Sequence, residues 1–192
     1  MKVFISAVVQ RMVNSDQSGI MFTVNPATNN ANEVVIEAVY GLGEMIVGGQ
    51  VNPDLYIVDK KTRDIKKTEL KTKEMGMFRT EEGKNEKRPI PKELQKRQVI
   101  PDSHVKELTR LGLKIEEHYK KPQDIEWAIE KDQIFIVQAR AVTTFKEQKS
   151  EDVKQVCEEN AKILVKQAKN AQVVVARQIV QKVHLFPALV AV

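Results

Sequence analysis

Two neighbouring stretches of alternating residues constrain the fold of this 192-residue chain more than any other feature. Residues 124–130 (DIEWAIE) and 134–140 (IFIVQAR) place β-branched and aromatic side chains at every second position. That period indicates two half-buried β-strands joined by a short polar turn. The first strand has an apolar face, formed by Ile125, Trp127 and Ile129. Its other face carries Asp124 and Glu126, so the chemistry of the hairpin is expected there.

The loop between the strands decides whether Gln138 and Arg140 join these carboxylates, because a slip of one residue turns every side chain of a strand to the other face. A two-residue loop, Lys131 and Asp132, would set Glu126 opposite Val137. A three-residue loop that adds Gln133 pairs Glu126 with Gln138 and Asp124 with Arg140. It also sets Trp127 opposite Val137 and Ile129 opposite Phe135, which makes a continuous apolar face. We therefore predict the three-residue loop, a type I turn followed by a left-handed residue.

Two carboxylates, an amide and a guanidinium on one face suit a polyphosphate ligand. Magnesium prefers carboxylate and amide oxygens and usually bridges a protein carboxylate to substrate phosphates. Arg140 adds a fixed fork of donors for phosphoryl oxygens. On spacing alone, a cross-strand ion pair on a solvated sheet face explains the same residues, and it is the commoner case.

A resemblance shifts the balance towards a functional site. The run DIEWAIEKDQIFIVQARAVTT resembles the end of the nucleotide-binding domain of the phosphoenolpyruvate synthase (pyruvate, water dikinase) family, relatives of pyruvate phosphate dikinase, where the domain closes on D-I-E-W…Q-x-R-P-x-T-T. The upstream run from VVQRMVNSDQSGIMF to GLGEMIVGGQVNPDLYIVD resembles the same domain, so the similarity spans residues 3–145. Ala141 stands where the family usually has proline, which is expected to loosen the strand end.

The resemblance implies an α+β fold: the C-terminal subdomain of an ATP-grasp domain, mainly antiparallel sheet with flanking helices, over residues 1–145. It implies ATP and Mg²⁺ as ligands, with Asp124, Glu126 and Gln138 holding the metal and the phosphates. Arg140 would act catalytically by neutralising the phosphoryl group being moved. The backbone around the QRMV segment would read the adenine, which makes Gln10, Met12 and Val13 candidates. Read without the resemblance, Met12 and Val13 are ordinary core residues.

The rest of the first 145 residues predicts further elements. Residues 3–13 and 18–24 are expected to form antiparallel strands around a turn, and residues 33–39 and 55–59 two more. The run GLGE at 41–44 is a tight turn or a phosphate-binding turn, and in the family it lies near the active site, which raises interest in Glu37 and Glu44. Residues 60–97 hold fourteen Lys/Arg and seven Asp/Glu, which predicts a solvated excursion with short strands. Asp102 or Ser103 is expected to cap an amphipathic helix that reaches Tyr119 and stops before Pro122.

Residues 146–192 depart from the resemblance and are expected to form a helical linker followed by an atypical apolar tail. In the family, a domain with a phosphorylated histidine follows at this point, and an N-terminal half with a lysine, an arginine and a glycine-rich loop precedes the region matched here. We therefore expect a partial domain whose partners are a nucleotide, these two missing parts and, for the apolar tail, a second copy of the chain.

Composition narrows the function classes. The net charge of +5 permits an acidic partner, but no aromatic RNA-binding run, zinc-ligand spacing or helix-turn-helix is present, so nucleic acid is not expected as a partner. The single cysteine, Cys157, excludes an intrachain disulfide and fits a cytoplasmic location. No apolar run is long enough to span a membrane.

Two functions remain open. In the first, the chain is the ATP-binding portion of an enzyme that phosphorylates pyruvate through a phosphohistidine, converting ATP, pyruvate and water to AMP, phosphoenolpyruvate and phosphate, and it is inactive alone. In the second, it is a non-catalytic assembly module that docks on a partner chain through its apolar tail.

Overall fold

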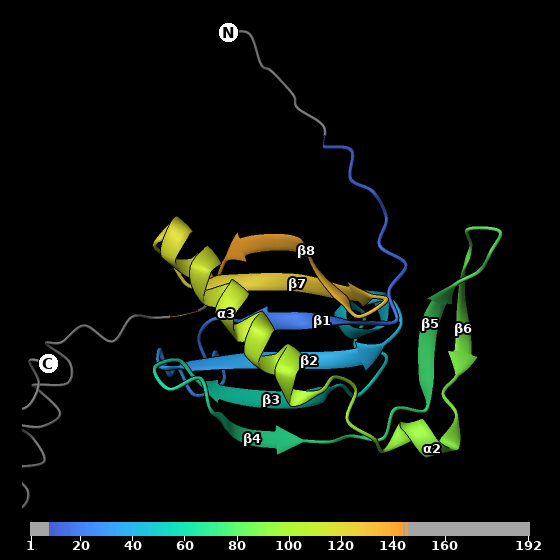
Figure 1. The fold of residues 1–192 in the computed structure, drawn as a ribbon, viewed down its shortest axis with the longest axis horizontal. Coiled ribbons are helices and arrows are strands. Elements are labelled where there is room, and N and C mark those ends of the chain that lie inside the picture. The colour runs from blue at the N-terminus through green and yellow to red at the C-terminus, as the bar shows by residue number, and fades with distance from the viewer. Residues whose placement is uncertain (1–7, 144, 146–192) are drawn as a thin grey trace, which may run out of the picture. The chain divides into compact units, whose positions relative to one another are not determined.

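The structure, a computed structural model, describes residues 8–143 and 145. Its main body is a six-stranded antiparallel sheet with the strand order β4-β3-β2-β1-β7-β8 (Figure 1). The strands of this sheet are β1 (Gln17–Phe22), β2 (Glu33–Tyr40), β3 (Asp54–Asp59), β4 (Ile65–Glu69), β7 (Gln123–Glu130) and β8 (Gln133–Ala141). The helices are α1 (Glu44–Val47), α2 (Lys92–Gln95) and α3 (Asp102–Tyr119), and β5 (Met75–Arg79) with β6 (Asn85–Pro89) forms a separate hairpin. The fold class is therefore α+β with a mainly antiparallel sheet, as the sequence predicts.

Strand β1 lies between β2 and β7 and pairs with both over its whole length. The prediction that residues 3–13 form its antiparallel neighbour is wrong for residues 8–13, which the structure describes as irregular backbone. The physical reason is that both hydrogen-bonding edges of β1 are already occupied. Residues 3–7 lie outside the described part of the chain.

Helix α3 covers one face of the sheet and buries its apolar side there (Figure 1). Val105 and Leu108 pack with Ile125, Trp127 and Ile129 of β7 in one core cluster. Gly112 permits the close approach of the helix, because a Cβ atom there would lie 2.7 Å from the Met21 methyl carbon. Asp124 and Glu126 alternate with the core residues of β7 and lie on the opposite face of the sheet from α3.

The start of α3 differs from the predicted cap. Pro101 is the N-cap residue, and no side chain makes a capping hydrogen bond. The Asp102 carboxylate instead accepts a hydrogen bond of 2.8 Å from the Gln98 side-chain amide. The helix ends as expected just before Pro122, with Lys120 in the left-handed conformation as its C-cap.

The hairpin of β7 and β8 has a shorter loop than predicted. Its turn consists of Lys131 and Asp132 alone, both with positive φ, 50° and 66°, as in a type I′ turn. Trp127 therefore lies opposite Ile136 and Ile129 opposite Ile134, so the two predicted apolar pairs are wrong. A register shift between Glu126 and Trp127 then leaves Val137 as one extra residue in β8, a β-bulge.

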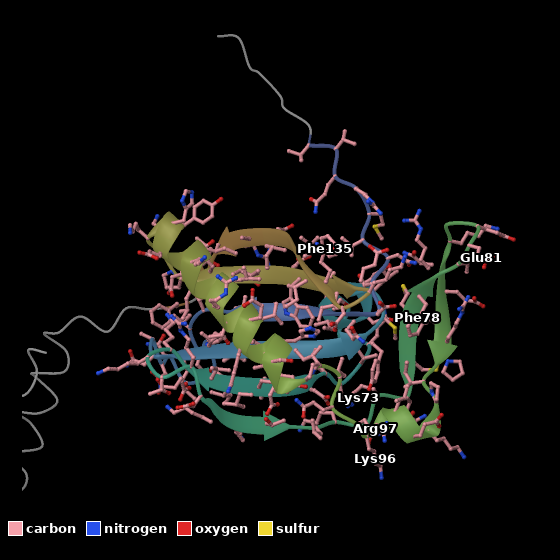
Figure 2. The ribbon with its side chains drawn as sticks, viewed as in Figure 1. Lys73, Phe78, Glu81, Lys96, Arg97 and Phe135 are labelled. Carbon is pink, nitrogen blue, oxygen red and sulfur yellow. The ribbon has the colours of Figure 1, made fainter. Side chains whose placement is uncertain are left out.

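The charged stretch 60–97 contains short strands, as predicted, and a buried ion pair helps to anchor it. Its hairpin touches the sheet through a parallel bridge between Gly41 and Met77. At the base of this hairpin, the Lys73 ammonium forms a buried ion pair of 2.6 Å with Asp54, and Lys73 and Arg97 lie close together (Figure 2).

The predicted helix and apolar tail of residues 146–192 lie outside the described residues. Within the described part, no helix is long and apolar enough to cross a membrane.

Candidate functional site

The open face of the sheet carries the predicted polar side chains in two transverse rows. Asp124 of β7 lies opposite Arg140 of β8, and Glu126 lies opposite Gln138, so both predicted cross-strand pairs are confirmed. On the other side of β7, β1 places Phe22 beside Asp124 and Ile20 beside Glu126. The second row continues through Ile20 to Glu37 on β2.

Asp124 and Arg140 form an ion pair on this face. The Arg140 Nε and Nη2 atoms lie 2.9 and 2.8 Å from the Asp124 Oδ2 atom. The hydrogen bond to Asp124, together with the negative charges of Asp124 and Glu126, raises the pKa of Arg140. The guanidinium is 66% exposed while the carboxylate is 12% exposed, so the cation is the partner that can turn towards a ligand.

Glu126 and Gln138 form the adjacent pair, and neither side chain makes a hydrogen bond to another described residue. Side chains two apart on a strand are about 7 Å apart, a spacing from which two carboxylates can reach one ion and its phosphate ligands. The described residues contain no group of three or more His, Cys, Asp or Glu that could hold a metal without help. The residues thus fit a magnesium ion that shares its coordination with phosphate oxygens and water, because such an ion needs only one or two protein carboxylates.

A groove of about 680 Å³ lies beside these rows. Its floor is formed by β1 and β7, through Ser18, Ile20, Glu126 and Ala128. Its walls come from residues 10–13, from the segment Leu42–Gln50 and from Asn85 of β6. Segments far apart in the sequence therefore meet around one concave surface, as a small-molecule site requires.

The structure places the predicted site residues in two neighbouring sets. Gln10, Met12, Val13 and Glu126 line the groove. Asp124, Gln138 and Arg140 lie next to it on the same sheet face but are not among its lining residues. Met12 is 51% exposed and Val13 is half-buried, so the alternative that both are ordinary core residues does not hold for Met12.

The glycine turn 41–43 forms a fixed part of the groove wall. The Ser18 hydroxyl donates a buried hydrogen bond of 2.6 Å to the Gly41 carbonyl, and Gly41 has a φ of 80°, a conformation that glycine adopts without strain. The Leu42 N–H donates to the Met77 carbonyl at 2.7 Å, and the Asn85 amide donates to Glu44 at 3.3 Å. The β5–β6 hairpin therefore holds the turn from outside while β1 holds it from below.

Glu37 is a half-buried carboxylate on the open face, between Ile20 of β1 and Leu55 of β3. Burial raises its pKa. No hydrogen bond or ion pair joins its side chain to another described residue, so the structure offers it no compensating partner there.

Val137 and Asn85 are among the groove residues that were not predicted from the sequence. Val137 enters the groove because it is the bulged residue, and no local pattern signals a bulge in the middle of an alternating strand. Asn85 enters through the β5–β6 hairpin, whose charged sequence indicated only a solvated excursion. The GLGE run did signal Glu44, which lines the groove.

A groove lined by apolar and polar side chains, beside carboxylate, amide and guanidinium groups, is typical of proteins that bind phosphate-bearing small molecules. Comparison with known protein families assigns the chain within that class. The profile of the family described as pyruvate phosphate dikinase, AMP/ATP-binding domain, matches residues 1–161. The chain belongs to this family.

Named relatives agree with this assignment. The chain is 46% identical over 171 residues to phosphoenolpyruvate synthase of Pyrococcus furiosus, which covers 85% of this chain and 21% of that protein. It is 46% identical over 165 residues to a probable phosphoenolpyruvate synthase of Methanocaldococcus jannaschii, with 86% of this chain and 14% of that protein covered. It is also 40% identical over 149 residues to rifampicin phosphotransferase of Bacillus subtilis, with 74% and 16% covered. The chain thus spans between 14% and 21% of the length of these relatives.

Proposed function

We propose that this chain binds Mg²⁺-ATP on the open face of its sheet, as the C-terminal subdomain of an ATP-grasp domain. The single observation that carries the proposal is the alignment of Asp124 with Arg140 and of Glu126 with Gln138 beside the groove. Glu126, Gln138 and the free oxygen of Asp124 hold the metal and the phosphates. The groove between residues 10–13 and α1 takes the nucleoside, with Gln10, Met12 and Val13 around the adenine.

Asp124, Glu126 and Gln138 would hold a magnesium ion, which would supply partial neutralisation of the phosphate charge. The protein's own contribution is positioning. The antiparallel pairing fixes the spacing of the polar side chains, and Arg140 brings a planar cation whose fork matches phosphoryl oxygens.

The names of the relatives support the nucleotide as the shared ligand. A phosphoenolpyruvate synthase and a rifampicin phosphotransferase act on different acceptors, yet both match this same stretch. Both names imply a phosphoryl donor, and a shared donor would explain why both proteins match the same stretch of this chain. We propose that the larger reaction is the conversion of ATP, pyruvate and water to AMP, phosphoenolpyruvate and phosphate, through a phosphohistidine supplied by another domain.

We further propose that this polypeptide alone binds Mg²⁺-ATP weakly and does not turn it over. Clamping a transferring phosphoryl group normally takes cations from several sides. Among the described residues of the groove and the two rows, the cations are Arg11 and Arg140. Synthesis of phosphoenolpyruvate by this polypeptide alone would contradict the proposal.

Isothermal titration calorimetry with Mg²⁺-ATP tests the binding. Wild-type protein should release heat with a dissociation constant in the range of about 0.1–1 mM, and Arg140→Ala should bind about tenfold more weakly. Heat that is the same in both proteins would remove Arg140 from the site.

The second candidate function is a non-catalytic assembly module. It is favoured by the adjacent Val8 and Val9 side chains, which are 90% and 98% exposed and offer apolar surface to a partner chain. The same titration discriminates, because an assembly module gives no heat with Mg²⁺-ATP in either protein and sediments as a dimer.

A further inference from the structure

The hairpin does not need the β-bulge at Val137 to align Asp124 with Arg140 or Glu126 with Gln138. On β7, Glu126 and Trp127 are consecutive, whereas their partners on β8 are Gln138 and Ile136. Without Val137, Ile136 and Gln138 would be consecutive too, and both pairs would form in a regular ladder. The bulge therefore serves something other than the register of Glu126 with Gln138 and of Asp124 with Arg140.

Val137 instead faces the groove wall formed by residues 10–13. It lines the groove together with Gln10 and Met12, and it is 37% exposed. Its carbonyl oxygen accepts a hydrogen bond of 3.4 Å from the Gln10 side-chain amide. Strand β8 is at the edge of the sheet, next to β7 alone (Figure 1). Bulges at sheet edges re-aim a residue and free backbone groups from the ladder.

The segment that receives this contact has few other fixed points. Gln10, Arg11 and Met12 are exposed, and none of them lies in a strand or helix. Among the described residues, the hydrogen bond from the Gln10 side-chain amide to the Val137 carbonyl ties residues 10–13 to the sheet. Ordering such a segment before a ligand arrives lowers the entropic cost of binding.

We propose that the Val137 bulge is a positioning device for the base-binding side of the groove. Its carbonyl holds Gln10, and through it residues 10–13, against the sheet, so that recognition of the nucleoside depends on the bulge while binding of metal and phosphate does not. This inference rests on the proposed nucleotide function and deepens it by dividing the site into two independently built halves.

Deletion of Val137 tests the division, because it removes the bulge and keeps the ion-binding pairs in register. Calorimetry compares Mg²⁺-ATP with Mg²⁺-tripolyphosphate, a probe that has the phosphates and no nucleoside. The deletion should weaken Mg²⁺-ATP binding about tenfold and change Mg²⁺-tripolyphosphate binding by less than about twofold. Equal losses for both probes, or no loss for either, would overturn the proposal.

Gln10→Ala provides a second variant that does not alter a strand and decides the matter if the deletion variant does not fold. It should show the same selective loss of affinity for Mg²⁺-ATP. Combined with the deletion it should add little further loss, because both changes break the same contact between Gln10 and Val137. Gln133→Ala, at the far end of β8, is the control and should bind both probes as wild type does. If Gln10→Ala bound Mg²⁺-ATP and Mg²⁺-tripolyphosphate with the same affinity ratio as wild type, the inference would be refuted.

Amide hydrogen exchange separates this inference from the proposed function. If wild-type protein binds neither probe, the nucleotide function fails, and exchange at residues 10–13 still reports the contact. In both variants the backbone amides of residues 10–13 should then exchange faster than in wild type, and those of β7 should exchange at the wild-type rate. Unchanged exchange at residues 10–13 would show that the bulge does not position the segment.

Discussion

One carboxylate oxygen of Asp124, Oδ2, accepts a hydrogen bond from Arg140 Nε at 2.9 Å and also forms the ion-pair contact of 2.8 Å with Arg140 Nη2. The pair therefore occupies half of the carboxylate. Oδ1 would remain available to a metal ion while the guanidinium stays in place, and both oxygens would be available if the guanidinium turned to a phosphate.

Arg140→Ala should weaken Mg²⁺-ATP binding by about tenfold, and Arg140→Lys should recover only part of it, because lysine keeps the charge without the planar fork. Thermal stability should change little in both, since the guanidinium is mostly exposed and exposed ion pairs contribute little. Calorimetry and a melting curve on each protein make the measurement. A large drop in melting temperature with unchanged affinity would assign the pair to the fold instead of the site.

Glu126→Gln should remove the dependence of nucleotide binding on magnesium. Wild-type protein should bind ATP about tenfold more tightly with Mg²⁺ than with EDTA, and the variant should show a ratio near unity, because an uncharged amide is a poorer ligand for the ion. Glu130→Gln is the matched control, as Glu130 lies on the same strand and the same face but pairs with Gln133, away from the groove. A retained magnesium effect in Glu126→Gln would shift the metal site to other residues.

The hairpin shows how far sequence reasoning reaches. Alternation predicted the two faces of β7 correctly, and the pairing of Glu126 with Gln138 was predicted through a three-residue loop. The structure reaches the same pairing with a two-residue turn and one bulged residue, since one extra residue in either place shifts the far half of β8 equally. Between turn and bulge the register differs, which is why the partners of Trp127 and Ile129 were predicted wrongly.

Other parts of the site depend on contacts distant in sequence. The strand predicted at residues 3–13 was inferred from local alternation, but β2 and β7 compete for the same edges of β1 and occupy them. Asn85 enters the groove because Gly41 and Leu42 pair with Met77 across a long sequence separation. Local sequence patterns carry no information on which strands pair with β1 or on the contact between the glycine turn and Met77.

Glu37→Gln should stabilise the protein at neutral pH. Burial raises the pKa of Glu37 above the value of 4.5 that applies when it is unfolded, so the folded state holds the proton more tightly than the unfolded state. The stability of wild type therefore falls as pH rises from 4.5 through the folded pKa, and glutamine removes that loss. Melting temperatures of the two proteins should converge near pH 4 and diverge towards about pH 7, with the variant higher. Glu93→Gln, exposed on α2, should follow wild type, and a gap for Glu37→Gln that does not depend on pH would refute the burial argument.

Lys73→Met should destabilise the fold far more than any change at the groove. Asp54 and Lys73 are 0% and 1% exposed, and the Asp54 carboxylate also accepts hydrogen bonds from the backbone N–H groups of Lys71 and Val99, at 2.9 and 3.0 Å. Removing one partner of a buried ion pair leaves an uncompensated charge and costs about 3–5 kcal/mol of unfolding free energy. Urea denaturation of the full chain measures the loss.

The double variant Asp54→Leu/Lys73→Met tests whether apolar residues can replace this buried ion pair. Apolar replacement of a buried pair is often neutral, but here it leaves the N–H groups of Lys71 and Val99 without their acceptor, so the double variant should remain destabilised by about 2 kcal/mol or more. Lys84→Met, whose pair with Glu82 is exposed, should unfold at the same urea concentration as wild type. Wild-type stability in the double variant would show that Asp54 does not organise the base of the β5–β6 hairpin. In that case the hairpin's hold on the glycine turn would come from the contact of Gly41 and Leu42 with Met77 and from the hydrogen bond between Asn85 and Glu44.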